Sequence, residues 1–282
     1  MKTENAAQIA EWNGVQGERW AAMTQQTEYI VLPFGVAAIA AAAPRPGERV
    51  IDVGCGCGDT AIELARQVGP EGAVIGVDVS RPMLAVATER GAQAGLPQLE
   101  FRECDASDAD LPGDIDLLYS RFGVMFFGAP SAAFARMRSA LRPGGRTVFV
   151  CWRAPRENPW AMAPLSAARA ALRVEAAPAD PNAPGPFAFA SESRVNGILT
   201  DAGFGAIEIR RFDATVTLGP TPRAAAETTV RIGPTSRFVR EMGSEHLPAI
   251  VDAVEKALAP LAAPDGGVHL PGSTWIVSAR NR

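Results

Sequence analysis

The chain has 282 residues, of which 47% are hydrophobic and 21% are charged, a balance that indicates a folded globular protein and excludes a disordered one. Its 31 acidic and 27 basic side chains give a net charge of −4, so we expect no nucleic-acid partner. The longest nearly apolar run, residues 29–43, is shorter than the ~20 residues that cross a bilayer, and Pro33 and Gly35 interrupt it. We therefore expect no membrane span.

The sequence begins Met1-Lys2-Thr3-Glu4-Asn5, without a basic stretch that leads into an apolar core. We therefore expect no secretory signal, and we predict a cytoplasmic protein. Its four cysteines are too few for a disulfide framework in a chain of this length and should stay reduced: Cys55, Cys57, Cys104 and Cys151. Cys55 and Cys57 invite a zinc interpretation, but both histidines lie far away in sequence, so we expect no metal.

Between residues 49 and 150, short β-branched runs alternate with amphipathic stretches, which predicts a parallel sheet with crossover helices. We predict strands at residues 49–53, 73–78, 99–104, 114–119 and 146–150. The helix after the first strand has Asp59 or Thr60 as its predicted N-cap, and Ser80 is the predicted N-cap of the next helix. This third of the chain carries the clearest structural signal.

After residue 152 the composition changes. Prolines concentrate between residues 153 and 190, where we predict a loop, and residues 178–186 cannot be regular structure. A helix face ends at Gly203, and strands are predicted at 206–212 and 273–279. The stretch between these strands, residues 213–267, is expected to be loop and helix.

The strongest chemical signal is a glycine-spaced turn that follows the first strand. Asp52 is followed by Gly54, Gly56 and Gly58, and Asp78 ends the next predicted strand. Such a turn allows a ligand to approach the backbone at the carboxyl end of a sheet, where an acid can accept ribose hydroxyls. A plain strand–helix connection is the alternative. The spacing differs from the dinucleotide fingerprint and places an acid where a cationic ammonium would lie.

At these residues the sequence resembles the class I S-adenosylmethionine-dependent methyltransferases, particularly small-molecule enzymes like the ubiquinone/menaquinone C-methyltransferases. The resemblance extends over about residues 45–150 and rests on four marks: residues 51–58, 76–84, 104–106 and 141–145. It implies an α/β fold, with a Rossmann-like seven-stranded sheet that is mostly parallel, an antiparallel last strand and helices on both faces. We predict three regions: an N-terminal helical flap (residues 1–44), where aromatics alternate with glycines, a cofactor-binding core (45–150) and a C-terminal half (151–282). The chain departs from the family in that half, because the last two strands, usually a tight pair, are separated by a predicted cap insertion at 213–267.

The resemblance implies contacts with S-adenosylmethionine, which becomes S-adenosylhomocysteine. Gly54 and Gly56 would flank the methionine moiety above Asp52, and Asp78 would bind the ribose. The adenine would contact Val79, Met83, Asp105 and Ala106, while Trp20 of the flap and Ser120 after the fourth strand complete the predicted cofactor contacts. The residues alone leave open a loop-capping Asp105, a core Met83, and simple packing of Trp12 and Trp20.

Candidates for the acceptor pocket are Tyr29, Phe34, Arg121, Phe126 and Trp152. Arg121 would bind an anionic acceptor or the cofactor carboxylate, or pair with a structural acid. No catalytic residue is identified; His246 in the cap insertion is a weak candidate base, and a solvated histidine is the alternative.

The predicted function is methyl transfer to O, N, S or C of a small-molecule acceptor by a monomer or homodimer. The alternatives are a catalytically silent cofactor-binding relative and a nicotinamide-dependent oxidoreductase.

Overall fold

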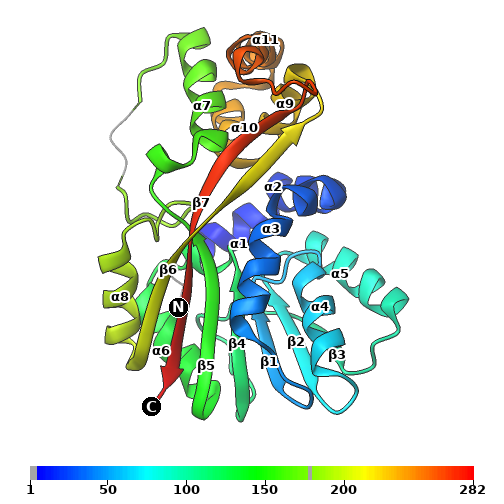
Figure 1. Ribbon diagram of the computed structural model, residues 1–282, viewed down its shortest axis with the longest axis vertical. Coiled ribbons are helices and arrows are strands. Elements are labelled where there is room, and N and C mark those ends of the chain that lie inside the picture. The colour runs from blue at the N-terminus through cyan, green and yellow to red at the C-terminus, as the bar shows by residue number, and fades with distance from the viewer. Residues whose placement is uncertain (1–4, 177–179) are drawn as a thin grey trace.

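The computed structural model describes residues 5–176 and 180–282. The first four residues and part of the predicted irregular segment 178–186 therefore lie outside the described residues. A single seven-stranded sheet runs through the molecule in the order β3-β2-β1-β4-β5-β7-β6 (Figure 1). Its strands are β1 (Arg49–Val53), β2 (Ala73–Asp78), β3 (Leu99–Glu103), β4 (Ile115–Arg121), β5 (Leu141–Trp152), β6 (Phe204–Gly219) and β7 (Val268–Asn281).

The strand order reverses between β1 and β4, and this reversal distributes the helices. The five strands from β3 to β5 are mutually parallel, and β7 is antiparallel to both of its neighbours. Because parallel crossovers are right-handed, connections that run in opposite directions from β1 and β4 place their helices on opposite faces. The helices of the first group are α4 (Asp59–Val68) and α5 (Arg81–Ala94), and those of the second are α6 (Pro130–Ala140) and α8 (Glu192–Asp201). The expected mostly parallel sheet with an antiparallel last strand is confirmed.

The N-terminal flap contains α1 (Ala6–Trp12), α2 (Val15–Ala22) and α3 (Thr24–Ala42). The last of these helices packs along β4, β5 and β6, while α2 contacts α5. Through these contacts, the flap joins the sheet at one end and reaches over the carboxyl ends of the strands at the other.

Among the described residues, no helix is both long and apolar enough to cross a membrane.

The cap insertion is shorter than predicted because the last two strands are longer. β6 and β7 stay paired from Phe204↔Asn281 to Gly219↔Val268, forming a ribbon that rises above the sheet (Figure 1). The prediction that residues 213–219 are loop or helix is wrong, because Val216 and Leu218 alternate inward and are buried. The cap insertion thus comprises residues 220–267, with helices α9 (Pro222–Thr229), α10 (Gly233–Met242) and α11 (Leu247–Leu258).

The predicted loop at 153–190 contains a helix, α7 (Pro159–Leu172), which packs against α10 and α11. Proline does not prevent this helix, because Pro159 occupies its first turn, where the missing N–H costs nothing. The segment is rich in alanine, and Trp160, Leu165 and Ala168 bury one face. Packing of that face outweighs the cost of Pro164 inside the helix.

Candidate active site

Glycines expose the backbone of the turn at the carboxyl end of β1. Gly54, Gly56 and Gly58 have φ of +70°, +56° and +88°, in the left-handed region that favours glycine. A Cβ on Gly56 would lie 2.9 Å from the Met83 Cε, and one on Gly54 would lie 2.8 Å from the Gly123 Cα. At Gly54 the added atom would meet backbone, whereas at Gly56 it would meet the flexible end of Met83, so the positive φ is the stronger constraint there. The turn therefore presents backbone rather than side chains to whatever lies above it.

The carboxylate of Asp78 ties this turn to β2. Its Oδ2 accepts a hydrogen bond from the Gly56 N–H at 2.8 Å, and its Oδ1 accepts one from the Ser80 N–H at 2.9 Å. Burial raises the pKa of Asp78, and these backbone donors oppose that rise. Each carboxylate oxygen keeps further lone-pair directions for a ligand hydroxyl.

A cavity of about 210 Å³ opens above the turn. It is bounded by the carboxyl ends of the central strands, the flap, α7 and the cap insertion. Eight of the ten predicted cofactor residues line it: Trp20, Gly54, Gly56, Asp78, Val79, Met83, Asp105 and Ala106. The topology therefore gathers residues that are up to 86 positions apart, from 20 to 106, around one space.

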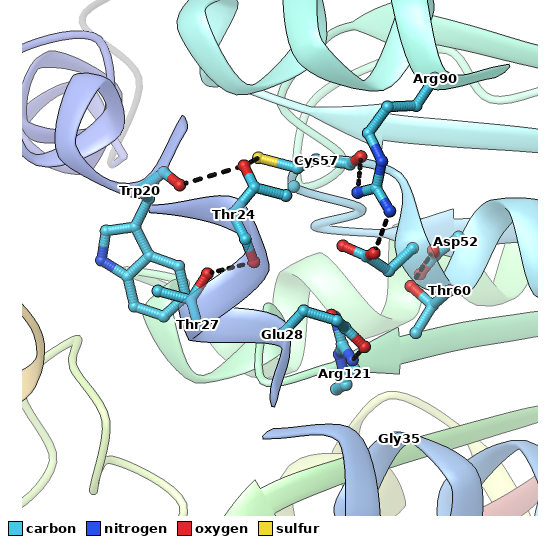
Figure 2. Close-up of polar contacts among 12 residues, drawn as sticks. Trp20, Thr24, Thr27, Glu28, Gly35, Asp52, Cys57, Thr60, Arg90 and Arg121 are labelled. Atoms are coloured by element: carbon cyan, nitrogen blue, oxygen red, sulfur yellow. Dashed lines mark hydrogen bonds and ion pairs between the residues drawn. The ribbon is translucent and has the colours of Figure 1, made fainter. Parts of the chain in front are cut away.

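Asp52 lies behind this cavity rather than in its wall. It is fully buried, and its Oδ2 accepts a hydrogen bond of 2.5 Å from the Thr60 Oγ1 (Figure 2). Burial raises the pKa of Asp52 to about 7, although the bond from Thr60 opposes the rise. The N-cap prediction for Asp59 or Thr60 is wrong, because Gly58 holds the cap position and the Thr60 hydroxyl, which lines the cavity, turns to Asp52.

Ser120 is also absent from the described lining of the cavity. It is buried at the end of β4, where its Oγ donates to the Val53 carbonyl oxygen at 2.7 Å and accepts from the Gly123 N–H at 3.3 Å. These bonds hold the end of β4 against β1. The structure thus gives Ser120 a positioning role in place of the direct cofactor contact that we expected.

Asn5 fastens the start of the flap to the core. Its Nδ2 donates to the Asp105 Oδ1 at 3.1 Å and to the Ser107 Oγ at 3.0 Å, and its Oδ1 accepts from the Gly128 N–H at 2.7 Å. Asp105 does accept hydrogen bonds from Ser107 within its own loop, as the capping alternative proposes. Its other oxygen, Oδ2, is buried without a partner. Asp105 is therefore a loop cap that also offers a free acceptor to the cavity.

A second attachment holds the turn between α1 and α2. The Asn13 Nδ2 donates to the Val79 carbonyl oxygen at 2.7 Å, and the Ser80 Oγ donates to the Trp12 carbonyl oxygen at 2.7 Å. Gly17 allows this close approach, because a Cβ there would lie 1.9 Å from the Trp12 carbonyl oxygen. The flap thus closes directly over the end of β2.

Four buried polar atoms at or behind this cavity have no hydrogen-bond partner in the described structure. They are the Gln8 Oε1, the Trp20 Nε1, the Asp52 Oδ1 and the Asp105 Oδ2. Leaving such groups unpaired costs about 1–3 kcal/mol each, so unpaired groups that gather in one place indicate a ligand that pairs with them. The Asp52 Oδ1 lies behind the cavity, whereas the other three atoms belong to lining residues. Two of these three atoms are acceptors and one is a donor, which favours a ligand that carries both donors and an acceptor.

The other end of the cavity carries an ion pair of Arg121 with an acid that the sequence did not identify. Glu28 on α3 and Arg121 at the end of β4 form two parallel hydrogen bonds, from Nη1 to Oε1 at 2.8 Å and from Nη2 to Oε2 at 2.6 Å (Figure 2). Burial lowers the pKa of Arg121, but its bonds with Glu28 raise it above its usual value, so the guanidinium stays charged. Of the two interpretations of Arg121, pairing with an acid is the one that the structure shows.

Aromatic side chains line the same cavity as this ion pair. The rings of Phe122 and Trp152 stack with their centroids 4.4 Å apart and their planes 8° from parallel. The ring centroid of Trp160 lies 4.8 Å from that of Trp152. On the flap side, Phe126 meets Trp12 edge to face at 5.4 Å. All five rings line the cavity. Trp160 was not predicted, because it reaches the site from a segment expected to be loop.

Three further predicted residues lie away from this cavity. Tyr29 follows Glu28 on α3 but points outward and is 62% exposed. Phe34 is fully buried and packs edge to face against Trp152 from behind, at 5.0 Å. The His246 side chain is 46% exposed before α11 and is absent from the cavity lining in the described residues. None of the three lines the cavity in the described residues, so the structure does not support the role expected of each.

Charge separates the two ends of the cavity. Its described lining holds four carboxylates, Glu28, Asp59, Asp78 and Asp105. Glu28 pairs with Arg121 and Asp59 pairs with Arg90, so Asp78 and Asp105 carry the remaining negative charge. No group of three or more potential metal ligands occurs among residues 5–176 and 180–282. The excess of negative charge favours a cationic ligand at the glycine turn.

Comparison with known proteins agrees with this geometry. Residues 50–145 match the model of a methyltransferase domain. Nocamycin O-methyltransferase from Saccharothrix syringae is 35% identical over 124 residues, covering 43% of this chain and 44% of that protein. A ubiquinone/menaquinone biosynthesis C-methyltransferase from Geobacter sulfurreducens is 37% identical over 116 residues, covering 40% and 44%.

The match with these curated relatives spans less than half of their length. Among solved structures, the YcgJ protein of Bacillus subtilis superposes with a TM-score of 0.58 at 18% identity, covering 88% of this chain and 97% of that one. This likeness shows a shared fold. The match to the methyltransferase domain model covers residues 50–145, which hold strands β1 to β4 almost completely and the glycine turn.

Proposed function

We propose that the protein is an S-adenosylmethionine-dependent methyltransferase that acts on a small-molecule acceptor. The observation that carries this proposal is the set of unpartnered buried atoms around the glycine turn. In the cavity lining, two acceptors, from Gln8 and Asp105, accompany one donor, from Trp20, in a region with excess negative charge, and the buried Asp52 lies behind them. S-adenosylmethionine is a cation with an ammonium, two ribose hydroxyls and an adenine amine as donors, and one carboxylate as acceptor.

The residues therefore fit this cofactor. Asp78 would hold the ribose, Asp105 would accept from the adenine amine, and Val79 and Met83 would contact the adenine ring. The buried carboxylate of Asp52 would favour the ammonium through Thr60 and the turn. When bound, the cofactor supplies an electrophilic methyl group on a sulfonium, which leaves as a neutral thioether.

The protein's own contribution is alignment and the exclusion of water. The flap is tied to the core through Asn5 and Asn13, and to the cap insertion through the Arg240–Glu11 ion pair at 2.8 Å. These attachments close the cavity around both ends. Holding two reactants in line in a dry site supplies much of the rate enhancement of such a transfer.

The nicotinamide alternative receives no support from the glycine turn, whose spacing departs from the dinucleotide fingerprint. A silent relative would bind the cofactor without turnover. The two can be separated from the proposed enzyme by calorimetry with S-adenosylhomocysteine and with NADH, followed by a screen of small-molecule acceptors for formation of S-adenosylhomocysteine.

We expect binding of S-adenosylhomocysteine, no binding of NADH, and turnover with at least one acceptor. Absence of S-adenosylhomocysteine binding by the folded protein would contradict the cofactor assignment. Binding without turnover across a broad acceptor panel would favour the silent relative.

A location in the cytoplasm and a monomer or homodimer complete the proposal. Equilibrium sedimentation of the full chain would determine the oligomeric state, and cell fractionation would test the location.

A further inference from the structure

The acceptor end of the cavity has no net charge. In the described lining, Glu28 and Arg121 neutralise each other. Asp59, whose charge also acts on Arg121, is neutralised in turn by its ion pair with Arg90. The other two carboxylates, Asp78 and Asp105, lie at the cofactor end, after β2 and β3. The acceptor end is thus an aromatic chamber that contains one internal ion pair.

Arg121 has little freedom to leave that pair. Its side chain lies between Glu28 and the backbone of α3 at Gly35, where an added Cβ would come within 3.0 Å of the Nη1. The side chains of Arg121 and Glu28 are only 13% and 21% exposed. A carboxylate ligand that took Arg121 would leave Glu28 unpaired inside the cavity, which is costly. The pair therefore disfavours anionic ligands.

The same pair still offers a hydrogen-bond acceptor. A carboxylate has about four lone-pair directions, and Arg121 uses one on each oxygen of Glu28. A neutral O–H group can donate to a remaining direction without breaking the pair. A cationic ligand gains little here, because Arg121 lies directly against Glu28 and repels it.

The walls favour a flat apolar ligand. Phe122 has a φ of +60°, an uncommon conformation for a bulky residue, and this backbone places its ring parallel to that of Trp152. Strained residues of this kind persist where the surrounding structure holds them, and they concentrate at functional sites. Trp160 extends the aromatic wall from α7, where its Nε1 donates to the buried Asn158 Oδ1 at 3.1 Å.

We propose that the acceptor is a neutral aromatic molecule with a hydroxyl group, and that the Glu28–Arg121 pair determines this specificity. The hydroxyl donates to Glu28 while the ring packs against Phe122, Trp152 and Trp160. The inference rests on the proposed function, because it assigns the other end of the cavity to the cofactor. It adds two residues that decide which acceptors enter.

Calorimetry of the full chain with S-adenosylhomocysteine tests the proposal. The probes are 2-naphthol, a neutral donor, and 2-naphthoate, which has the same rings and a negative charge. We expect wild type to bind 2-naphthol at least about tenfold more tightly than 2-naphthoate, because a hydrogen bond to a charged group is worth about that ratio or more.

Glu28→Gln should reverse this preference. It keeps the side-chain shape but frees Arg121, so 2-naphthoate should gain about tenfold and 2-naphthol should weaken. The single variant leaves the buried Arg121 without its carboxylate and can fail to fold for that reason. The double variant Glu28→Gln/Arg121→Gln leaves no unpaired charge, so it tests the proposal in that case. It should bind 2-naphthol more weakly than wild type does, without gaining affinity for 2-naphthoate.

Glu48→Gln is the matched control. Glu48 and Arg146 form an equally bidentate, largely buried pair, with bonds of 2.9 and 2.8 Å. The pair lies beside the amino end of β1, away from the cavity at the carboxyl ends of the strands. This variant should leave the ratio of the two probe affinities within about twofold of wild type. The control separates a local effect of Glu28 from a general loss of ion pairing.

Three results would overturn the proposal: neither probe binds wild type, wild type prefers 2-naphthoate, or Glu28→Gln leaves the probe ratio unchanged. Failure of S-adenosylhomocysteine to bind would instead count against the proposed function. Its binding is measured first in every variant, so the two failures are distinguishable.

Discussion

The two ends of the cavity are built in different ways. The cofactor end comes from three short segments that each follow a strand, around Gly54, Asp78 and Asp105. Backbone N–H groups that donate to the carboxylates of Asp78 and Asp105 hold much of it. The acceptor end joins α3, the ends of β4 and β5, α7 and the cap insertion through side-chain contacts. A site built on backbone requires bare glycine and fixed acids, whereas a site built from side chains can be altered one residue at a time.

The largest expected effect breaks the cofactor end alone. Gly56→Val should lower affinity for S-adenosylhomocysteine more than about a hundredfold, because the left-handed backbone disfavours valine and the new side chain meets Met83. Calorimetry measures this loss. Gly95→Val is the matched control, since Gly95 has a similar φ of +64° with nothing within 4 Å of an added Cβ. An equal loss in both variants would show a fold defect rather than a site.

Asp52→Asn tests whether the buried acid of the cofactor end is pH-sensitive. The pKa of Asp52 rises from 3.8 to about 7 on folding, so the folded state retains its proton to higher pH. The favourable contribution of the protonated acid is complete below pH 3.8 and is lost as pH rises toward 7.

The variant should therefore gain stability relative to wild type across this range, by at most about 4 kcal/mol. Chemical denaturation between pH 4 and 8 without ligand measures the difference. A constant difference at all pH values would contradict the raised pKa.

Asp78→Asn should weaken S-adenosylhomocysteine binding by about ten- to a hundredfold, because the carboxylate loses its charge toward ligand hydroxyls. Asp116→Asn is its control. Asp116 also accepts a hydrogen bond from a backbone N–H, that of Arg49, at 2.8 Å. It lies near the amino end of β4, away from the cavity at the carboxyl ends of the strands. Unchanged affinity in a folded Asp78→Asn protein would remove this residue from the cofactor site.

Trp160→Leu should have the smallest effect and should act only at the acceptor end. We expect 2-naphthol to bind about tenfold more weakly, since one wall of the chamber is lost, while S-adenosylhomocysteine affinity stays within about threefold. His246→Ala is the control, because the exposed histidine should change neither affinity. Equal losses for both ligands would show that the two ends are not independent.

The different construction of the two cavity ends also decides how much of each end the sequence can predict. β1 and β2 begin and end at the predicted residues, because short β-branched runs between glycine turns are local signals. The glycine turn and both strand-end acids were recognisable for the same reason. Eight of the ten predicted cofactor residues line the cavity, since each follows a strand within a few positions.

The acceptor end was harder to predict from the sequence, because its contacts join segments that are far apart along the chain. Glu28 and Arg121 are 93 positions apart, and only the packing of α3 along the sheet brings them together. A signal did exist, because Glu28 is followed by a long uncharged run in which an isolated acid needs a partner. Trp160 was hidden by prolines that predict a loop, although the alanine content of the same segment favours a helix.

One carboxylate, that of Asp105, serves both the flap and the cavity. Its Oδ1 accepts from Asn5, while its Oδ2 is free for a ligand donor. A ligand held by Asp105 and a flap held by Asn5 would depend on the same carboxylate, so ligand binding and flap closure would stabilise each other by the same free energy, as linkage requires. Protection of the flap from proteolysis should therefore rise with ligand binding, and weakening the Asn5 attachment should lower the equilibrium affinity for the ligand.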